Sequence, residues 1–395
     1  MTEEGICLKE THSYLVPDYF PGFSCKMGAC RAACCVGWPI SFTMKDYFRL
    51  LGIDCSPDLR RKLDVAMKMV DHPTEEQYAQ ISPRYDGQCP MRMEDGRCAM
   101  QAELGNEALA AVCSLYPRGL RTDGDYECSC ANSCEAVLEM LLHRGPIRFL
   151  PHSITCDLPP AAQRGNHFET VGRAQSIRLW LISLMQDQRY PLAQRLLLLG
   201  EGLYTMDGAL SAKDEARVAR LLDRQEALPA PNPITPGSEQ LHCGLEVAGR
   251  LLEMIDEQSV SIRDYGQAAL TYFLSGSDPF LQYQQAEAHF SRLIPDWPQW
   301  FENMLVNHMF FTQFPFQDRP VDLKDEYIAL CVVYALLRFL CIGWTADKED
   351  PSAAVDVAAA AFRLIDHTEF DRYAAPMLKR LGYEKWHQLQ HILCL

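Results

Sequence analysis

The chain lacks the positive charge that a nucleic-acid-binding protein needs. Its 395 residues include 37 Lys and Arg against 52 Asp and Glu, which gives a net charge of −15 at pH 7. The sequence contains no basic block, and the negative electrostatic field of such a protein repels nucleic acid and anionic membrane surfaces. With 48% hydrophobic and 23% charged residues, the composition is typical of a globular protein and excludes intrinsic disorder and a fibrous repeat.

The sequence also lacks the features of a secreted or membrane protein. Residues 1–5 are acidic where a secretory signal needs positive charge and an apolar core, so we expect a cytoplasmic location. The longest apolar run, Ile328 to Trp344, is interrupted by Arg338 and flanked by Asp325 and Asp347. This run favours a buried helix over a membrane span, and we expect no membrane partner.

Cysteine, in contrast, is abundant and unevenly placed. Of the 17 cysteines, 13 lie at or before Cys156. A reducing compartment disfavours structural disulfides, so clustered cysteines favour metal binding or redox chemistry. Cysteines without a close partner in sequence are interpreted as small apolar packing residues: these are Cys7, Cys55, Cys156, Cys243, Cys331, Cys341 and Cys394.

The other ten cysteines form three groups, which predict a metal centre. They are Cys25, Cys30, Cys34 and Cys35; then Cys89, Cys98 and Cys113; then Cys128, Cys130 and Cys134. Thiolates that converge on one ion at about 2.3 Å need a short, turning backbone, which Gly28 allows in the first group. Zinc and an iron–sulfur cluster suit four thiolates about equally, and the adjacent pair in the first group favours a cluster. A disulfide network is the competing interpretation.

Helical periodicity dominates the rest of the chain and predicts a mainly α fold. The expected helices span residues 44–70, 103–115, 135–143, 174–186, 192–204, 212–222, 245–257, 262–274, 304–316 and 327–342. Turn signals place Cys89 on a loop, and Thr122 to Asp125 predicts a small hairpin among the cysteines.

Four domains or segments are expected. Residues 1–156 form a cysteine-cluster metal-binding region and 157–227 a helical segment, while 241–395 form a helical C-terminal domain. Between the last two, residues 228–240 form a linker or loop, because the four prolines in this stretch disfavour a helix interior.

These motifs together resemble the flagellin lysine-N-methylase family, whose cysteine region is shared with a wider group of zinc- or iron-chelating CxxCxxCC proteins. The resemblance is carried by Tyr14 to Pro17, the first cysteine group, Cys89-Pro90, Asp95 to Cys98, Leu104-Gly105, Cys113, Tyr116 to Arg118 and Ser133-Cys134. A second block covers Leu305 to Phe310, Phe314 to Phe316 and Tyr327 to Arg338, whereas the middle of the chain matches only loosely.

The resemblance implies transfer of a methyl group from S-adenosylmethionine to lysine ε-amino groups of flagellin. It also implies a metal centre that holds an iron–sulfur cluster or another metal, and with the adjacent cysteines we expect a 4Fe-4S cluster in preference to zinc. The matching ligands are Cys25, Cys30, Cys34, Cys35, Cys89, Cys98, Cys113 and Cys134. Eight thiolates exceed the four of one cluster, so either some pack or two centres exist.

The binding site for the methyl donor is not visible in the sequence. A glycine-rich loop and the radical C-x3-C-x2-C spacing are both absent. One hypothesis is that an iron with an open coordination position anchors the amino-carboxylate of the donor; the alternative is a metal that only stabilises a loop-rich segment.

Four side chains are weak candidates for catalysis: Tyr116, Arg118, Asn307 and His308. Arg118 can meet a carboxylate of donor or substrate, with a structural ion pair as an equal alternative. Asn307 and His308 can line a pocket with nearby phenylalanines, although core packing is the more common role of aromatic residues at this spacing. Weaker still are Tyr85 with Asp86 or Glu94 as a proton acceptor, and His387 with His391 as metal ligands. The alternative functions are a non-enzymatic iron- or zinc-chelating or redox-sensing protein, and a methylase that modifies a protein other than flagellin.

Overall fold

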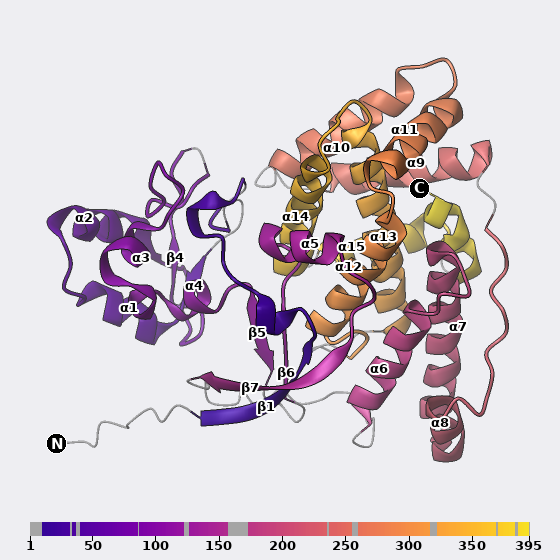
Figure 1. Ribbon diagram of the computed structural model, residues 1–395, viewed down its shortest axis with the longest axis horizontal. Helices are drawn as coiled ribbons and strands as arrows, with labels where there is room; N and C mark the ends of the chain where they lie inside the picture. Colours follow the sequence, from indigo (N-terminus) through magenta and orange to yellow (C-terminus); the bar gives the residue numbers. More distant parts are fainter. Residues whose placement is uncertain are drawn as a thin grey trace.

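The structure is a computed structural model, shown as a ribbon in Figure 1. It describes residues 10–31, 34–36, 40–85, 87–121, 126–156, 173–234, 237–254, 260–316, 322–368, 370–383 and 386–394. A small N-terminal module lies beside a larger helical body, and a mixed sheet lies between them in this view.

The helical body confirms the prediction of a mainly α fold. Its elements are α6 Ala174–Met185, α7 Leu192–Ser211, α8 Glu215–Leu222, α9 Ser238–Glu253, α10 Val260–Leu274, α11 Pro279–Leu293, α12 Trp297–Phe311, α13 Leu323–Thr345, α14 Ser352–His367, α15 Phe370–Arg380 and a 3-10 helix at Trp386–Cys394. One hydrophobic core runs from Tyr14 to Leu393 and joins α6 and α7 to the later helices.

The helix α13 is the centre of this body, and it packs against α7, α10, α11, α14 and α15. By length and composition it is the one described helix that could cross a membrane, and 94% of its apolar window is buried inside the protein. The buried helix expected over 328–344 is therefore confirmed. Its Arg338 is buried too, because its guanidinium pairs with Glu287 and lies 4.6 Å from the ring centroid of Trp297.

A four-stranded sheet brings the two ends of the N-terminal region together. Its order is β5-β6-β1-β7, with β1 Glu10–Pro17, β5 Arg118–Arg121, β6 Glu127–Cys130 and β7 Phe149–Cys156. The predicted hairpin is confirmed by the antiparallel pairing of β5 with β6, although its turn at 122–125 lies outside the described residues. The strands β1 and β7 were not predicted. They pair over their whole length, and β7 is an edge strand that tolerates Pro151.

The N-terminal module has its own hydrophobic core, built from residues between Ile40 and Val112. It contains α1 Met44–Leu51, α2 Pro57–Ala66, α3 Ala99–Leu104, α4 Ala111–Leu115 and a three-stranded sheet in the order β2-β4-β3, formed by Ser41–Phe42, Ala79–Ile81 and Met67–Met69. After this module the chain enters the body through α5 Glu135–Leu142.

Several helix predictions need correction. The helix expected over 44–70 is wrong: α1 ends before Gly52, Ser56 caps α2 by accepting the N–H of Leu59, and the chain then becomes β3. The helix expected over 103–115 is also two helices, because Gly105 adopts a φ of 85° that ends α3. No helix was predicted over α11, α14 or α15, and α9 begins at Ser238, inside the expected linker 228–240.

Candidate functional site

The eight cysteines expected to bind metal gather where the N-terminal module meets α5. They come from four places in the chain: the segment after β1, the loop after β4, the helix α4 and the residue before α5. Folding therefore brings together groups that are up to about a hundred residues apart in sequence. No disulfide joins the cysteines whose side chains the structure describes.

One set of thiols belongs to the module and is formed by Cys35, Cys89, Cys98 and Cys113. The sulfur of Cys35 accepts hydrogen bonds from the thiols of Cys34 and Cys89, and these bonds lower its pKa to about 3. Desolvation raises the pKa of Cys113 to about 12, and the nearby thiols of Cys98 and Cys35 add to the shift. Each member is thus close enough to another member to affect its ionisation.

A second set lies toward the helical body and is formed by Cys25, Cys30 and Cys134. Burial raises the pKa of Cys30 to about 11, with Glu135 and Cys134 as further causes. The thiol of Cys134 lies at the start of α5 and interacts with backbone N–H groups of that helix and with Cys25. Cys34 is close to both sets, because Cys35 and Cys113 of the module set and Cys134 of the body set all raise its pKa.

The thiols are neighbours, but they do not yet form a closed metal cage. Over the ranges that the structure describes, no three His, Cys, Asp or Glu side chains surround one point as ion ligands would. The residues nevertheless fit an iron–sulfur cluster or zinc in donor type, because soft thiolates are the ligands that both prefer.

The remaining cysteines pack or lie apart from this cluster. Cys128 and Cys130, on β6, are buried in the core of the body. Cys331, Cys341 and Cys394 are buried as expected. Cys7 and the side chain of Cys156 lie outside the described residues.

A belt of charged residues fixes the first cysteine segment to the helical body. The ammonium of Lys26 lies 2.6 Å from a carboxylate oxygen of Glu135, whose side chain is fully buried. Arg31 pairs with Glu139 at 3.1 Å and with Asp356 on α14 at 2.7 Å. The backbone that carries Cys25, Cys30 and Cys34 is therefore held against α5 and α14.

Beside the thiols, a chain of polar side chains connects the module to α14. The hydroxyl of Tyr116 lies 3.1 Å from Oγ of Ser133, and this Oγ lies 2.9 Å from Nε2 of His367. Burial and the neighbouring Cys134 raise the pKa of Tyr116 well above its usual value. Burial lowers the pKa of His367 below 6.5, and the positive charge of Arg363 adds to this shift. At neutral pH the imidazole is therefore neutral and able to accept a proton.

The structure places the four catalytic candidates in different settings. Tyr116 belongs to the polar chain just described. His308 is buried, with Nδ1 3.1 Å from Asp366 on α14. Arg118 lies with its guanidinium carbon 4.9 Å from the ring centroid of Phe23, and it forms no ion pair with any residue that the structure describes. It is thus a half-buried cation near Cys130, available to a carboxylate.

Asn307 is part of the architecture that supports the site. Its amide nitrogen donates to the carbonyl of Cys130 at 2.8 Å and to the side-chain oxygen of Asn132 at 2.7 Å. Its amide oxygen accepts a hydrogen bond from the hydroxyl of Tyr19 at 2.7 Å. Because all these groups are buried, Asn307 joins β6 to α12, and both of its amide N–H donors are already used inside the protein.

The weaker candidates are only partly described by the structure. Tyr85 is fully exposed, Glu94 is exposed and Asp86 lies outside the described residues. His391 is near the C-terminus, and the side chain of His387 is outside the described residues, so this pair is not tested.

Sequence reasoning missed His367 as a member of the site. A signal existed: α14 is rich in alanine and ends abruptly in Asp366, His367 and Thr368. Polar residues that end such an apolar helix either cap it or belong to a site. Here Asp366 contacts His308, and His367 contacts Ser133.

The fold and the site define a helical protein with a thiol-rich module docked against one end of its core. The model of the FliB lysine N-methylase C-terminal domain matches residues 178–395, more than half of the chain. The protein belongs to this family. The matched part is the helical body that contributes His308 and His367.

Two curated proteins are similar to a shorter part of the chain. The lysine-N-methylases of Salmonella typhimurium (strain LT2) and Salmonella choleraesuis (strain SC-B67) are each 30% identical to it over 132 residues. The matched part covers 32% of this chain and 32% of each relative. No solved structure matches the chain.

Proposed function

We propose that this protein transfers a methyl group from S-adenosylmethionine to lysine ε-amino groups of flagellin. The observation that carries the proposal is the family match over residues 178–395, since the matched body supplies His367 to the polar chain beside the thiols. The lysine-N-methylases of the two Salmonella strains support lysine methylation as the reaction class. Flagellin as the acceptor rests on the resemblance of the cysteine motifs.

The proposed reaction is a direct displacement. A lysine ammonium first loses a proton, and the lone pair of the resulting amine attacks the methyl carbon of the sulfonium donor. The new N–C bond forms as the S–C bond breaks, and the electron pair of that bond stays on sulfur to give a neutral thioether. The positive charge passes to the methylated nitrogen, so the reaction needs a proton acceptor and a good orientation but no oxidant.

The chain Tyr116–Ser133–His367 is the proposed route for that proton. The lowered pKa of His367 leaves its imidazole neutral. Hydrogen bonds of 2.9 Å and 3.1 Å connect this imidazole through Ser133 to Tyr116. The hydroxyl of Tyr116 is the end nearest Cys34 and Cys134. A substrate ammonium at this end would pass its proton toward the imidazole and become the nucleophilic amine.

We further propose that the eight clustered cysteines hold metal, with an iron–sulfur cluster favoured over zinc. The module set and the body set described above would provide the ligands, and the charged belt of Lys26 and Arg31 would hold the body set in place. When bound, such a cluster supplies an iron that can coordinate the amino-carboxylate of the donor. In this proposal Arg118 binds the same carboxylate, and the support is that its cation has no carboxylate partner among the described residues.

The test is metal analysis followed by donor binding and activity. Protein purified without oxygen should contain iron and acid-labile sulfide, bind S-adenosylmethionine in calorimetry and methylate purified flagellin, as read by mass spectrometry of its lysines. The double substitution Cys35→Ser with Cys25→Ser, one cysteine from each set, should remove most of the iron, whereas Cys243→Ser, outside the cluster, should retain it.

A second function, a chelating or redox-sensing protein, is favoured by one observation, the low pKa of Cys35 among neighbouring thiols. Metal binding without donor binding or methyl transfer would overturn the methylase proposal in favour of this alternative.

A further inference from the structure

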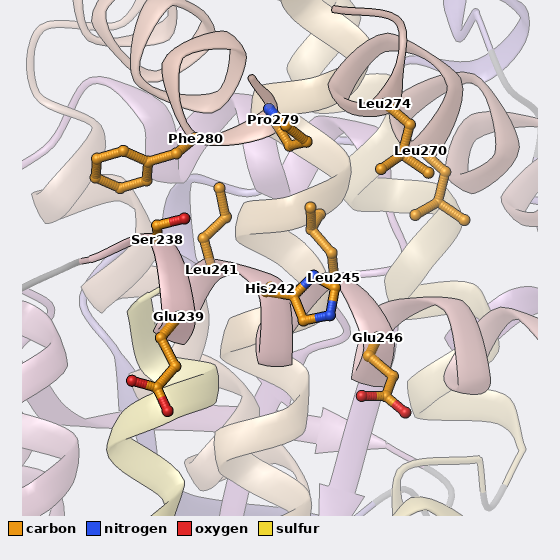
Figure 2. Close-up of a pocket in the computed structure, with 10 residues that line it drawn as sticks. All are labelled: Ser238, Glu239, Leu241, His242, Leu245, Glu246, Leu270, Leu274, Pro279 and Phe280. Carbon is orange, nitrogen blue, oxygen red and sulfur yellow. The ribbon is translucent and has the colours of Figure 1, made fainter. Parts of the chain in front are cut away.

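The helical body carries an open groove far in sequence from the thiol cluster. It has a volume of about 730 Å³ and lies between α9, α10 and the start of α11. Figure 2 shows its lining, with Leu241 and Leu245 directed from α9 toward the leucines of α10 and toward Pro279. Neither the reaction nor the metal centre proposed above uses this surface.

The apolar side chains of the groove are spaced for helix packing. Leu241 and Leu245 are four residues apart on α9, and Leu270 and Leu274 are four residues apart on α10. Leu241 and Leu245 are buried and form the floor of the groove, whereas Leu270 is half-buried and Leu274 is exposed on its wall, so the apolar face of a third helix can cover them. Leu274 is 59% exposed, which is costly for a leucine unless a partner covers it.

The polar edge of the groove is acidic. Glu239 and Glu246 lie seven residues apart on α9, and Figure 2 shows both carboxylates extending from the side of the helix away from the leucines. Both are exposed, and neither forms an ion pair with any residue that the structure describes. The lining contains no lysine or arginine, and His242 lies between the two carboxylates.

We propose that this groove docks an amphipathic helix that carries lysines, on the protein that the enzyme methylates. The apolar face of the helix lies on the leucines of the groove, and long lysine side chains on its flank extend past the edge of α9 toward Glu239 and Glu246. Seven residues of helix span about 10.5 Å at a rise of 1.5 Å per residue. Two lysines seven residues apart on the docked helix therefore match the spacing of the two carboxylates.

This inference rests on the proposed function, because only a protein substrate gives the groove a partner. It adds that the substrate is held at a second surface, by a segment with one apolar and one basic face. The net charge of −15 supports the same partner, since it attracts a basic segment before contact.

The first experiment measures binding without catalysis. The probes are two fluorescent helical peptides with the same leucine face, one with lysines and one with glutamates on its flank. The full-length protein should bind the lysine peptide about tenfold more tightly than the glutamate peptide. The double variant Glu239→Lys with Glu246→Lys should reverse this preference, and Leu274→Asn should weaken both peptides.

A matched control reverses two carboxylates elsewhere on the body. Asp223 and Glu349 are exposed and form no ion pair within the described part of the chain, so Asp223→Lys with Glu349→Lys makes the same change in net charge. This control should keep the wild-type preference. Equal losses in both double variants, or wild-type binding in the groove variant, would overturn the inference, because net charge or another surface would then explain the peptides.

The second experiment separates this inference from the proposed function. In flagellin methylation, the groove variants should raise KM about tenfold with little change in kcat, as expected for binding that is equal in ground and transition states. If the lysine peptide binds the groove but the wild-type protein does not methylate flagellin, the proposed function is wrong and docking in the groove is retained. If flagellin is methylated with a wild-type KM by the groove variants, the groove fails and the function stands.

Discussion

Ser133 and His367 are 234 residues apart in sequence, and the Oγ of the first lies 2.9 Å from Nε2 of the second. This hydrogen bond joins the residue before Cys134 to the last residue of α14. It is a direct link, beside the ion pair of Arg31 with Asp356, between the thiol cluster and the part of the chain that matches the lysine N-methylase family. A change at either residue should therefore affect methyl transfer without removing the metal.

We expect His367→Asn to lower kcat for flagellin methylation about a hundredfold, which is the usual contribution of a positioned general base. Asparagine retains a polar side chain but has no group that takes up a proton near neutral pH. Single-turnover methylation measures the chemical step, and iron content should stay at the wild-type level. The matched control is His72→Asn, on an exposed loop of the module, which should leave kcat unchanged. A wild-type rate for His367→Asn would exclude His367 from proton transfer.

The lowered pKa of His367 also predicts how stability depends on pH. In the folded protein its pKa lies below the usual 6.5, so as the pH falls through 6.5 the unfolded chain takes up a proton before the folded one does. Stability should therefore decrease below pH 6.5 and level off below the folded pKa. Urea unfolding from pH 8 to pH 5 should show a smaller decrease for His367→Asn than for the wild type. Parallel curves for the two proteins would contradict the shift.

A buried ion pair in the body provides a test of the fold. Arg195 on α7 pairs with Glu302 on α12, and both side chains are almost fully buried. Glu302→Gln leaves the guanidinium charge without its counterion, which should cost about 3 kcal/mol of the free energy of unfolding. The exposed pair Arg250 and Glu253 is the control, and Glu253→Gln should change stability by less than about 0.5 kcal/mol. Urea unfolding measures both, and equal effects would contradict the role of burial.

Much of the body could be predicted from the sequence, because its helices carry their own signal. The apolar run of α13 predicts a buried helix whatever its neighbours are, and the structure buries it as expected. The strands β1 and β7 could not be found in this way. Each has eight residues, but their pairing joins Glu10 to Cys156 across the whole module, so the stabilising contacts are invisible to a local window.

The site shows the same contrast. The cysteine groups were visible because thiols at short spacings are rare in a reducing compartment, and folding brings the eight chosen residues near one another. The role of Asn307 was not visible, because a sequence does not show that its amide is already occupied by Tyr19, Cys130 and Asn132. His367 was missed for the opposite reason, since its partner Ser133 lies in a distant segment.

The division of the thiols predicts two separate metal centres. Cys98 belongs to the module set with Cys35, Cys89 and Cys113, whereas Cys25 belongs to the body set with Cys30 and Cys134. If each set holds its own cluster, Cys98→Ser and Cys25→Ser should each remove about half of the iron and sulfide, because one cluster needs about four ligands of its own. Metal analysis of protein purified without oxygen gives the result.

The double variant distinguishes two centres from one. Cys98→Ser combined with Cys25→Ser should lose nearly all the iron, as independent sites require. Loss of all the iron in either single variant would instead show one centre shared across Cys34, which is close to both sets. Cys243→Ser controls for the loss of any cysteine, and thermal unfolding of each variant separates loss of metal from loss of fold. Because the two outcomes differ about twofold in iron per chain, ordinary metal analysis decides between them.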